Sequence, residues 1–253
     1  MAAGILARMT EVLHGKVLPP SLYAVAAAKG GVGKTTLAYE LAYILAAILA
    51  DFDWDGGGAT RAWGYLHERR KRAPLLDALE RRRVPQPLKG HRKPDLVPSH
   101  PDLVANQPAA EELTNQLETW PEALQRPVVA DTHPGGGDVT YGVLAAAKVV
   151  IVTAVLATKE LSALEQQLEE LADYPLLIVP YRVPPVPPAR QLERFRSIVN
   201  AAGVPVAPPV SYYKWIPGRQ RRTAICSADP VPARAEAFVD EVGAVAKEVV
   251  NYG

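Results

Sequence analysis

The chain has 253 residues, of which 48% are hydrophobic, and is therefore long enough to bury one sizeable core. Its 28 lysines and arginines nearly balance its 27 acidic residues. This balance excludes a protein that binds nucleic acid through a strongly positive net charge. With Cys226 as its single cysteine, one chain forms no disulfide and no thiolate cluster of its own, as is typical of a reducing cytoplasm.

The first twenty residues are expected to form an accessory arm or a short helix, because polar and charged residues interrupt their apolar runs. The most apolar region, Leu37–Leu49, is too short to span a bilayer and contains Glu40, so it predicts a buried helix that runs into a strand. We expect residues 21–253 to form a single domain with no membrane span.

Short apolar runs rich in β-prone residues recur along the chain and predict buried strands at Leu22–Ala27, Ala47–Phe52, Val128–Ala130, Val149–Ala154 and Leu176–Val179. Helical patterns lie between most of them, and one covers Ala189–Ala202. Right-handed crossovers place such helices on both sides of a sheet. The sequence therefore predicts an α/β fold with a doubly wound, mainly parallel sheet and helices on both faces. Ligands of such sheets bind beyond the carboxyl ends of the strands.

The first predicted strand runs into a glycine-rich loop and then a helical pattern. The loop reads Ala28-Lys29-Gly30-Gly31-Val32-Gly33-Lys34-Thr35-Thr36. Glycines let backbone N–H groups face phosphate oxygens, and the start of the helix adds positive potential. Lys34 supplies a cation for the phosphates and Thr35 supplies a hydroxyl for Mg²⁺. This order of strand, loop and helix predicts a P-loop.

Acidic residues follow two further predicted strands. Asp51, Asp53 and Asp55 come at the end of the second strand, and Asp131 follows Val128–Ala130, shortly before Gly135. Mg²⁺ and an attacking water both need oxygen partners near the phosphates. We expect these carboxylates to lie beside the P-loop.

Basic residues gather near the carboxyl end of the chain. Between Arg182 and Arg222 there are eight lysines and arginines against one acid, Glu193. Such a local excess neutralises nucleic-acid phosphates without reading a sequence, or else it forms a solvated surface. The clusters Arg69–Arg72 and Arg81–Arg83 extend this basic track or form a solvated helix face.

The last segment, Val231–Val250, has the apolar periodicity of a helix that packs on the sheet. Its apolar face comprises Ala235, Phe238, Val239, Val242, Val245 and Val249. The opposite face is acidic, whereas a membrane-surface helix carries lysine and arginine there. The pattern therefore argues against membrane docking.

The glycine loop resembles the deviant Walker A motif of the ParA/MinD superfamily of ATPases. A strict P-loop has glycine where this chain has Ala28, and the hallmark of the superfamily is a second lysine, here Lys29. The resemblance implies ATP and Mg²⁺ as cofactors and an ATP-bound sandwich homodimer in which Lys29 reaches the partner's phosphates. The implied nucleotide contacts in the loop are Lys29, Gly30, Gly31, Val32, Gly33, Lys34, Thr35 and Thr36.

The same resemblance assigns roles to residues beyond the loop. Lys29, Lys34 and Asp53 are the implied catalytic residues, with Asp53 orienting or activating the hydrolytic water. The implied magnesium site comprises Thr35, Asp51 and Asp131. Gly135 corresponds to the switch II position whose backbone N–H lies near the γ-phosphate. Tyr181 and Arg182 occupy the place where family members often contact adenine.

The chain departs from the family's pattern at three places. Trp54 and Asp55 replace the usual Pro-Gln after Asp53, and His133 stands where the family usually has proline. A lone histidine of this kind is more often structural than catalytic. Sixteen residues separate Lys34 from Asp51, fewer than the family's usual spacing. Either the turn between helix and strand is tight, or a segment is missing.

By resemblance, the leading hypothesis is a short ParA-type partition ATPase that is cytoplasmic and nucleoid-associated. Its ATP dimer binds non-specific DNA and is released by slow hydrolysis that a ParB-like centromere-binding protein stimulates, which segregates a plasmid or chromosome. The expected DNA contacts are Lys214, Arg219, Arg221 and Arg222.

Three alternatives belong to the same superfamily. The first is an ATPase that positions a protein cargo, such as a carboxysome or chemoreceptor cluster. The second is a MinD-like membrane-associated regulator, which the acidic final helix disfavours. The third is an iron–sulfur reductase ATPase, which the single cysteine disfavours because those relatives bridge a cluster with paired cysteines.

Overall fold

The structure of the chain is a computed structural model that describes residues 18–55, 58–66 and 73–252. Most of the predicted N-terminal arm and all of the Arg69–Arg72 cluster lie outside these residues. Among the described residues, Leu18 is buried against the core.

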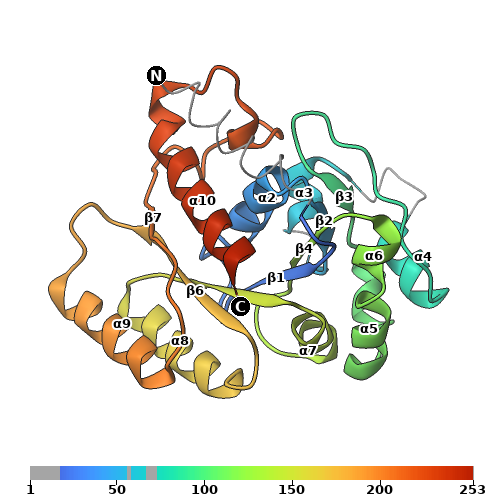
Figure 1. The fold of residues 1–253 in the computed structure, drawn as a ribbon, viewed down its shortest axis with the longest axis horizontal. Coiled ribbons are helices and arrows are strands. Elements are labelled where there is room, and N and C mark those ends of the chain that lie inside the picture. The colour runs from blue at the N-terminus through green and yellow to red at the C-terminus, as the bar shows by residue number, and fades with distance from the viewer. Residues whose placement is uncertain (1–17, 56–57, 67–72, 253) are drawn as a thin grey trace.

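A seven-stranded sheet runs through the molecule in the order β3-β2-β4-β1-β5-β6-β7, and every pair of neighbouring strands is parallel (Figure 1). The strands are β1 (Leu22–Ala26), β2 (Ile48–Asp51), β3 (Asp95–Val97), β4 (Val128–Asp131), β5 (Val149–Ala154), β6 (Leu176–Val183) and β7 (Val210–Ser211). All five predicted strands are confirmed. The sequence missed β3 and β7, which have three and two residues and are too short to show a period.

Helices cover both faces of the sheet, which confirms the doubly wound α/β fold (Figure 1). One face packs against α2 (Lys34–Ile44), α3 (Ala59–Trp63) and α10 (Ala233–Asn251). The other packs against α4 (Pro74–Glu80), α5 (Ala110–Leu117), α6 (Trp120–Leu124), α7 (Asp138–Ala145), α8 (Thr158–Glu170) and α9 (Ala189–Ala202). Two 3₁₀ turns, η2 (Pro101–Val104) and η3 (Ile225–Ser227), complete the described elements.

Side chains of the central strand β1 point alternately to the two faces of the sheet and so contribute to both hydrophobic cores. In β1, Tyr23 and Val25 join the core under α2 and α10, whereas Leu22, Ala24 and Ala26 join the core on the other face. A central parallel strand is buried on both sides, which explains why β1 reads as one continuous apolar run.

The last helix, α10, packs on the sheet as the sequence predicted. Its buried residues include all six apolar positions of the predicted face, from Ala235 to Val249. No helix among the described residues combines the length and apolar character needed to cross a bilayer.

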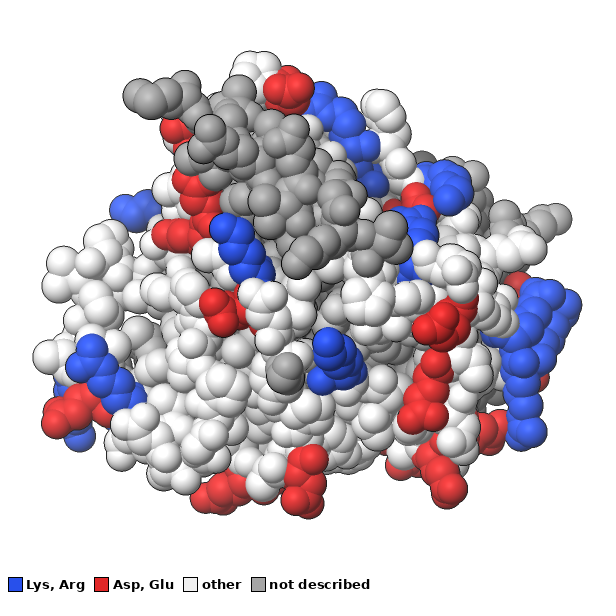
Figure 2. Space-filling model, viewed as in Figure 1, with Lys and Arg blue, Asp and Glu red and all other residues white. Residues whose placement is uncertain are grey.

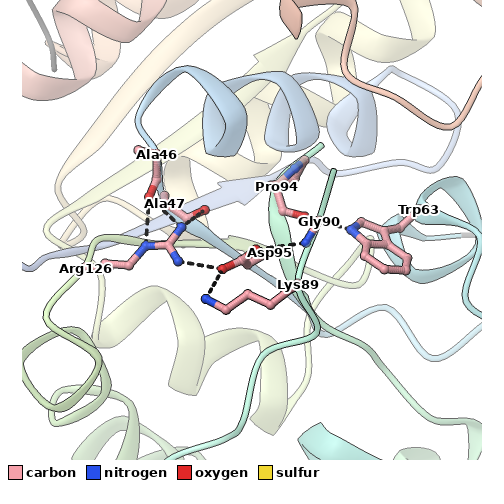
Figure 3. A network of polar contacts seen from close by, with 8 residues as sticks. All are labelled: Ala46, Ala47, Trp63, Lys89, Gly90, Pro94, Asp95 and Arg126. Carbon is pink, nitrogen blue, oxygen red and sulfur yellow. Dashed lines mark hydrogen bonds and ion pairs between the residues drawn. The ribbon is translucent and has the colours of Figure 1, made fainter. Parts of the chain in front are cut away.

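The turn between α2 and β2 explains the short spacing between Lys34 and Asp51. Only residues 45–47 connect the two elements, and the Ala47 N–H bonds back to the Ala42 carbonyl at 2.9 Å. The guanidinium of Arg126 donates to the Ala46 carbonyl at 3.0 and 2.8 Å (Figure 3). A tight, internally satisfied turn therefore joins the helix to the strand.

Asp95 at the start of β3 holds Arg126 in this position (Figure 3). Its carboxylate accepts hydrogen bonds from Arg126 at 2.6 Å, Lys89 at 2.9 Å and the Gly90 backbone at 2.9 Å. Burial alone would raise the pKa of Asp95, but these donors hold it below its ordinary value. One network thus ties the edge strand to the α2–β2 turn.

Replacing Ala46 by glycine is expected to stabilise the protein by about 1 kcal/mol, because Ala46 adopts a left-handed conformation with φ of 49° that strains any residue with a Cβ. Urea denaturation of wild type and A46G gives the difference. The matched control is Ala237→Gly in α10, an exposed site inside the helix where glycine should cost about 1 kcal/mol. Equal losses at both sites would contradict the prediction.

Candidate functional site

The glycine-rich loop connects β1 to α2 at the carboxyl edge of the sheet. Gly31 and Gly33 have φ values of 79° and 100°, which side chains rarely adopt. A Cβ on Gly33 would also lie 2.3 Å from Cε1 of Tyr181, so the backbone approaches that ring too closely for any other residue. The loop therefore has the conformation that its sequence predicts.

The strand order brings two acidic strand ends beside this loop. β4 lies between β1 and β2, so Asp131 and Asp51 follow neighbouring strands and are paired in register. Both are fully buried. Lys34 Nζ lies 2.7 Å from Asp131 Oδ1 and also donates to the Thr132 carbonyl. Three of the predicted residues thus form one buried cluster.

Asp51 is held by backbone donors. Its carboxylate accepts hydrogen bonds from the Thr60 amide at 2.5 Å and the Asp53 amide at 3.0 Å. Burial, followed by the nearby carboxylate of Asp131, raises the pKa of Asp51 well above its ordinary range. Two buried carboxylates on paired positions of neighbouring strands attract a cation.

The cluster suits Mg²⁺. Asp131 Oδ2 is buried and has no hydrogen-bond partner among the described residues, although a buried carboxylate oxygen normally has one. Oxygen ligands are those that Mg²⁺ prefers, and the predicted third ligand, Thr35, lies in the first turn of α2 next to Lys34. Asp51, Asp131 and Thr35 are the residues that would hold the ion.

A cleft of about 520 Å³ opens above the loop, a volume within the usual range for ligand sites. One wall is the P-loop, from which Lys29, Gly30, Gly31, Gly33, Lys34, Thr35 and Thr36 line the cleft. Further lining residues were missed by the sequence analysis, namely Ser211, Tyr212, Tyr213, Ile216 and Pro217, and Arg219, which was predicted as a DNA contact, lines the cleft with them. The signal in the sequence was the aromatic run that follows β6 and α9.

Tyr181 and Arg182 lie beside the P-loop and both line the cleft. Tyr181 is buried against Gly33, and burial raises the pKa of its hydroxyl. Arg182 has a φ of 59°, and its guanidinium donates to the Gly31 carbonyl at 2.7 Å. These contacts support the loop directly. Arg182 also lies over the ring of Tyr212, 5.2 Å from its centroid, and that exposed ring lines the same cleft.

Lys29 and Asp53 lie at the rim of the same cleft. Lys29 is exposed, and its Nζ donates to the Lys159 carbonyl at the start of α8, at 3.1 Å. Its predicted reach into a partner subunit remains a prediction. The backbone N–H of Gly135, the predicted switch II glycine, lies 3.4 Å from the Ala27 carbonyl at the start of the P-loop.

The predicted DNA contacts separate into two kinds. Lys214, Arg221 and Arg222 are exposed, as expected. Arg219 is half-buried, and its guanidinium donates to the Thr223 carbonyl at 2.6 Å. Burial lowers the pKa of this guanidinium. Arg219 therefore holds its own segment and lines the cleft, instead of projecting into solvent.

The other basic cluster is partly neutralised. Arg82 forms an ion pair with Glu112 of α5 at 2.6 Å, and Figure 2 shows basic side chains beside α4 with acidic ones next to them over α5. This pairing favours the interpretation of Arg81–Arg83 as a solvated surface.

Glu40, which the sequence marked only as a charge within an apolar run, joins the P-loop helix to the basic segment. Its carboxylate accepts hydrogen bonds from the Ile225 and Cys226 amides at 2.7 and 2.9 Å. Burial raises the pKa of Glu40, and the two amides oppose this rise. One residue earlier, the Tyr39 hydroxyl donates to the Arg222 carbonyl at 2.7 Å. Two consecutive residues of α2 thus anchor residues 222–226.

Comparisons with known proteins agree with this geometry. Residues 21–175 match the AAA_31 family model, described as an AAA domain. No curated protein matches the chain.

Solved structures share the fold at low identity. Apo McdA from Cyanothece has a TM-score of 0.71 at 18% identity, covering 91% of this chain and 99% of its own. MinD from Aquifex aeolicus has a TM-score of 0.70 at 17% identity, covering 92% and 98%. A plasmid partition protein from Borrelia burgdorferi bound to AMPPNP has a TM-score of 0.67 at 16% identity, covering 91% and 98%. The chain therefore belongs to the AAA_31 family of AAA domains and shares its fold with MinD.

Proposed function

We propose that this protein is a ParA-type DNA-partition ATPase. With ATP and Mg²⁺ bound, it forms a sandwich homodimer that binds non-specific DNA on the nucleoid. Slow hydrolysis, stimulated by a ParB-like partner, releases the dimer and segregates a plasmid or chromosome.

A basic groove beside the nucleotide cleft is the observation that carries this proposal. The groove has a volume of about 230 Å³ and is lined by Arg61, Arg219, Arg221 and Arg222. It shares Thr35, Thr36, Ile216 and Arg219 with the nucleotide cleft. Arginine-lined grooves suit the phosphates of a DNA backbone. A change at the nucleotide therefore has a short path to the surface that would hold DNA.

The residues of the cleft suit ATP hydrolysis. Backbone N–H groups of the P-loop and Lys34 would hold the phosphates, and Asp53 at the rim would orient the attacking water. Bound Mg²⁺ would neutralise charge on the phosphate oxygens. The apolar wall formed by Ile216 and Pro217 would orient the base.

Membrane docking through the last helix is disfavoured. The apolar residues of α10 pack in the core, and the helix presents Asp240, Lys247 and Glu248 to solvent. A bilayer would meet a mixed polar face. Positioning of a protein cargo is the remaining alternative, and genes for an organelle or a chemotaxis system beside this gene would favour it.

Binding to non-specific duplex DNA, measured with ATP, ADP or no nucleotide at two salt concentrations, tests the proposal. The variant Arg61→Ala/Arg221→Ala should weaken ATP-dependent binding at least tenfold and reduce the salt slope by about 2, since each lost phosphate contact removes about 0.9. Arg219 is left intact because its side chain supports the fold.

The matched control is Arg190→Ala/Arg196→Ala, which removes two exposed arginines from α9 on the other face of the sheet. This variant should bind DNA like the wild type. Binding that ignores nucleotide, or an equal loss in both variants, would refute the proposed DNA surface. Absence of DNA binding with normal ATP hydrolysis would favour a member of the superfamily that docks on a protein or a membrane.

A further inference from the structure

Two loops that follow acidic strand ends contact each other beside the nucleotide cleft. The β2–α3 loop carries Trp54 and Asp55, and the β4–α7 loop carries His133. The imidazole of His133 lies flat on the Trp54 indole, with ring centroids 4.2 Å apart and 2° between the planes. Its Nε2 atom lies 2.9 Å from Asp55 Oδ2. The His133 ring thus contacts the β2–α3 loop through both its face and its edge.

These contacts join the three residues that depart from the ParA/MinD pattern around the strand ends. Trp54 and Asp55 replace proline and glutamine in one loop, and His133 replaces proline in the other. A proline at position 133 provides neither a planar ring nor a hydrogen-bonding nitrogen. The substitutions therefore complement one another, as expected for residues that act as a unit.

The contact also constrains Asp53, which lies between the buried strand end and the stacked pair. The Asp53 amide donates to Asp51 Oδ1 at 3.0 Å, and the Asp53 carboxylate accepts from the Asp55 amide at 3.2 Å. Asp53 lines the nucleotide cleft together with Pro134, the residue after His133. Contacts that hold Trp54 and Asp55 in place therefore also hold Asp53 in place.

We infer that Trp54, Asp55 and His133 form a clamp that joins the β2–α3 loop to the β4–α7 loop and positions Asp53 at the rim of the cleft. The side chain of His133 is only 18% exposed, so its ring is largely shielded from water, whereas the Asp55 side chain is 69% exposed. His133 is a positioning residue in this arrangement. The effect on hydrolysis rests on the proposed ATPase activity, whereas the clamp itself does not.

A double-mutant cycle on stability tests the clamp. Trp54→Ala, His133→Ala and the double variant are unfolded in urea without nucleotide. Each variant raises the equilibrium constant for unfolding by some factor over the wild type. The factors of the two single variants, multiplied together, should be about five times the factor of the double variant, as for other stacked ring pairs. His133→Phe keeps a ring over Trp54 and should retain most of this coupling. As a control, replacing the exposed His91 by alanine should show no coupling with Trp54→Ala.

A chelator is present throughout the cycle. The ligand atoms of Asp53, Asp55 and His133 lie within 4.8 Å of one another, so a bound divalent ion is a different way to join the loops. Coupling that survives chelation supports the direct clamp. Additive single changes, or coupling that requires added divalent ion, would overturn it.

Turnover tests the positioning of Asp53. His133→Ala should lower kcat for ATP about tenfold and leave the Kd for ATP within twofold, because P-loop contacts hold the phosphates. In an Asp53→Asn background, His133→Ala should cause no further loss. A further tenfold loss there would show that His133 acts independently of Asp53. A wild type without hydrolysis would refute the positioning role and the ATPase, while the stability cycle would still decide the clamp.

Discussion

Replacing Lys34 by methionine is expected to abolish ATP hydrolysis and to lower the free energy of unfolding of the nucleotide-free protein by about 3 kcal/mol. Lys34 is buried and lies 2.7 Å from Asp131 Oδ1, while Asp131 Oδ2 has no partner among the described residues. Removing one member of a buried ion pair leaves the other charge uncompensated, which costs about 3–5 kcal/mol. Urea denaturation with a chelator measures the loss, and phosphate release measures turnover.

A second substitution shows how much of the stability loss in Lys34→Met comes from the broken ion pair and how much from lost packing. Asp131→Asn in the Lys34→Met background removes the stranded charge and should restore a substantial part of the stability, although turnover stays absent. Lys159→Met, at an exposed position of α8, should change stability by no more than about 0.5 kcal/mol. A K34M protein that unfolds at the same urea concentration as the wild type would contradict the assigned pair.

Replacing Glu40 by alanine is expected to cost about 3 kcal/mol of stability and to weaken ATP-dependent DNA binding. The Glu40 carboxylate is the acceptor for the Ile225 and Cys226 amides, and its removal leaves two buried donors unpaired and opens a cavity. Glu40→Gln keeps one acceptor oxygen and should lose about half as much. Urea denaturation of the three proteins measures this order.

The control for this prediction is Glu248→Ala, which removes an exposed glutamate from α10 and should leave stability unchanged within about 0.5 kcal/mol. Tyr39→Phe removes the hydroxyl that donates to the Arg222 carbonyl without opening a large cavity. It should therefore weaken DNA binding with little loss of stability. An E40A protein as stable as E248A would show that residues 225–226 do not depend on α2.

Together, these contacts explain how one helix serves two surfaces. The first turn of α2 faces the nucleotide cleft through Thr35 and Thr36, and the second turn holds the basic segment through Tyr39 and Glu40. A helix is stiff over so short a distance. A displacement at the phosphates would therefore be carried to the arginines of the groove.

The sequence alone determined the elements that depend on local pattern. Runs of apolar residues identified the central strands, and helix α9 was predicted at Ala189–Ala202, where the structure has it. The glycine loop was recognised because its residue types are dictated by backbone geometry at Gly31 and Gly33. Acids at strand ends were placed correctly because parallel strands end at one edge of the sheet.

Only the tertiary structure decided contacts between residues far apart in the chain. The Glu40 carboxylate meets amides 185 and 186 residues later, and His133 meets Asp55 from 78 residues away. Arg219 reads like its exposed neighbour Arg221, yet it turns inward because Thr223 and the cleft wall receive it. Periodicity and composition report which residues prefer burial or a given backbone shape. They do not report which partner completes each buried hydrogen bond, because the folded packing of distant segments selects it.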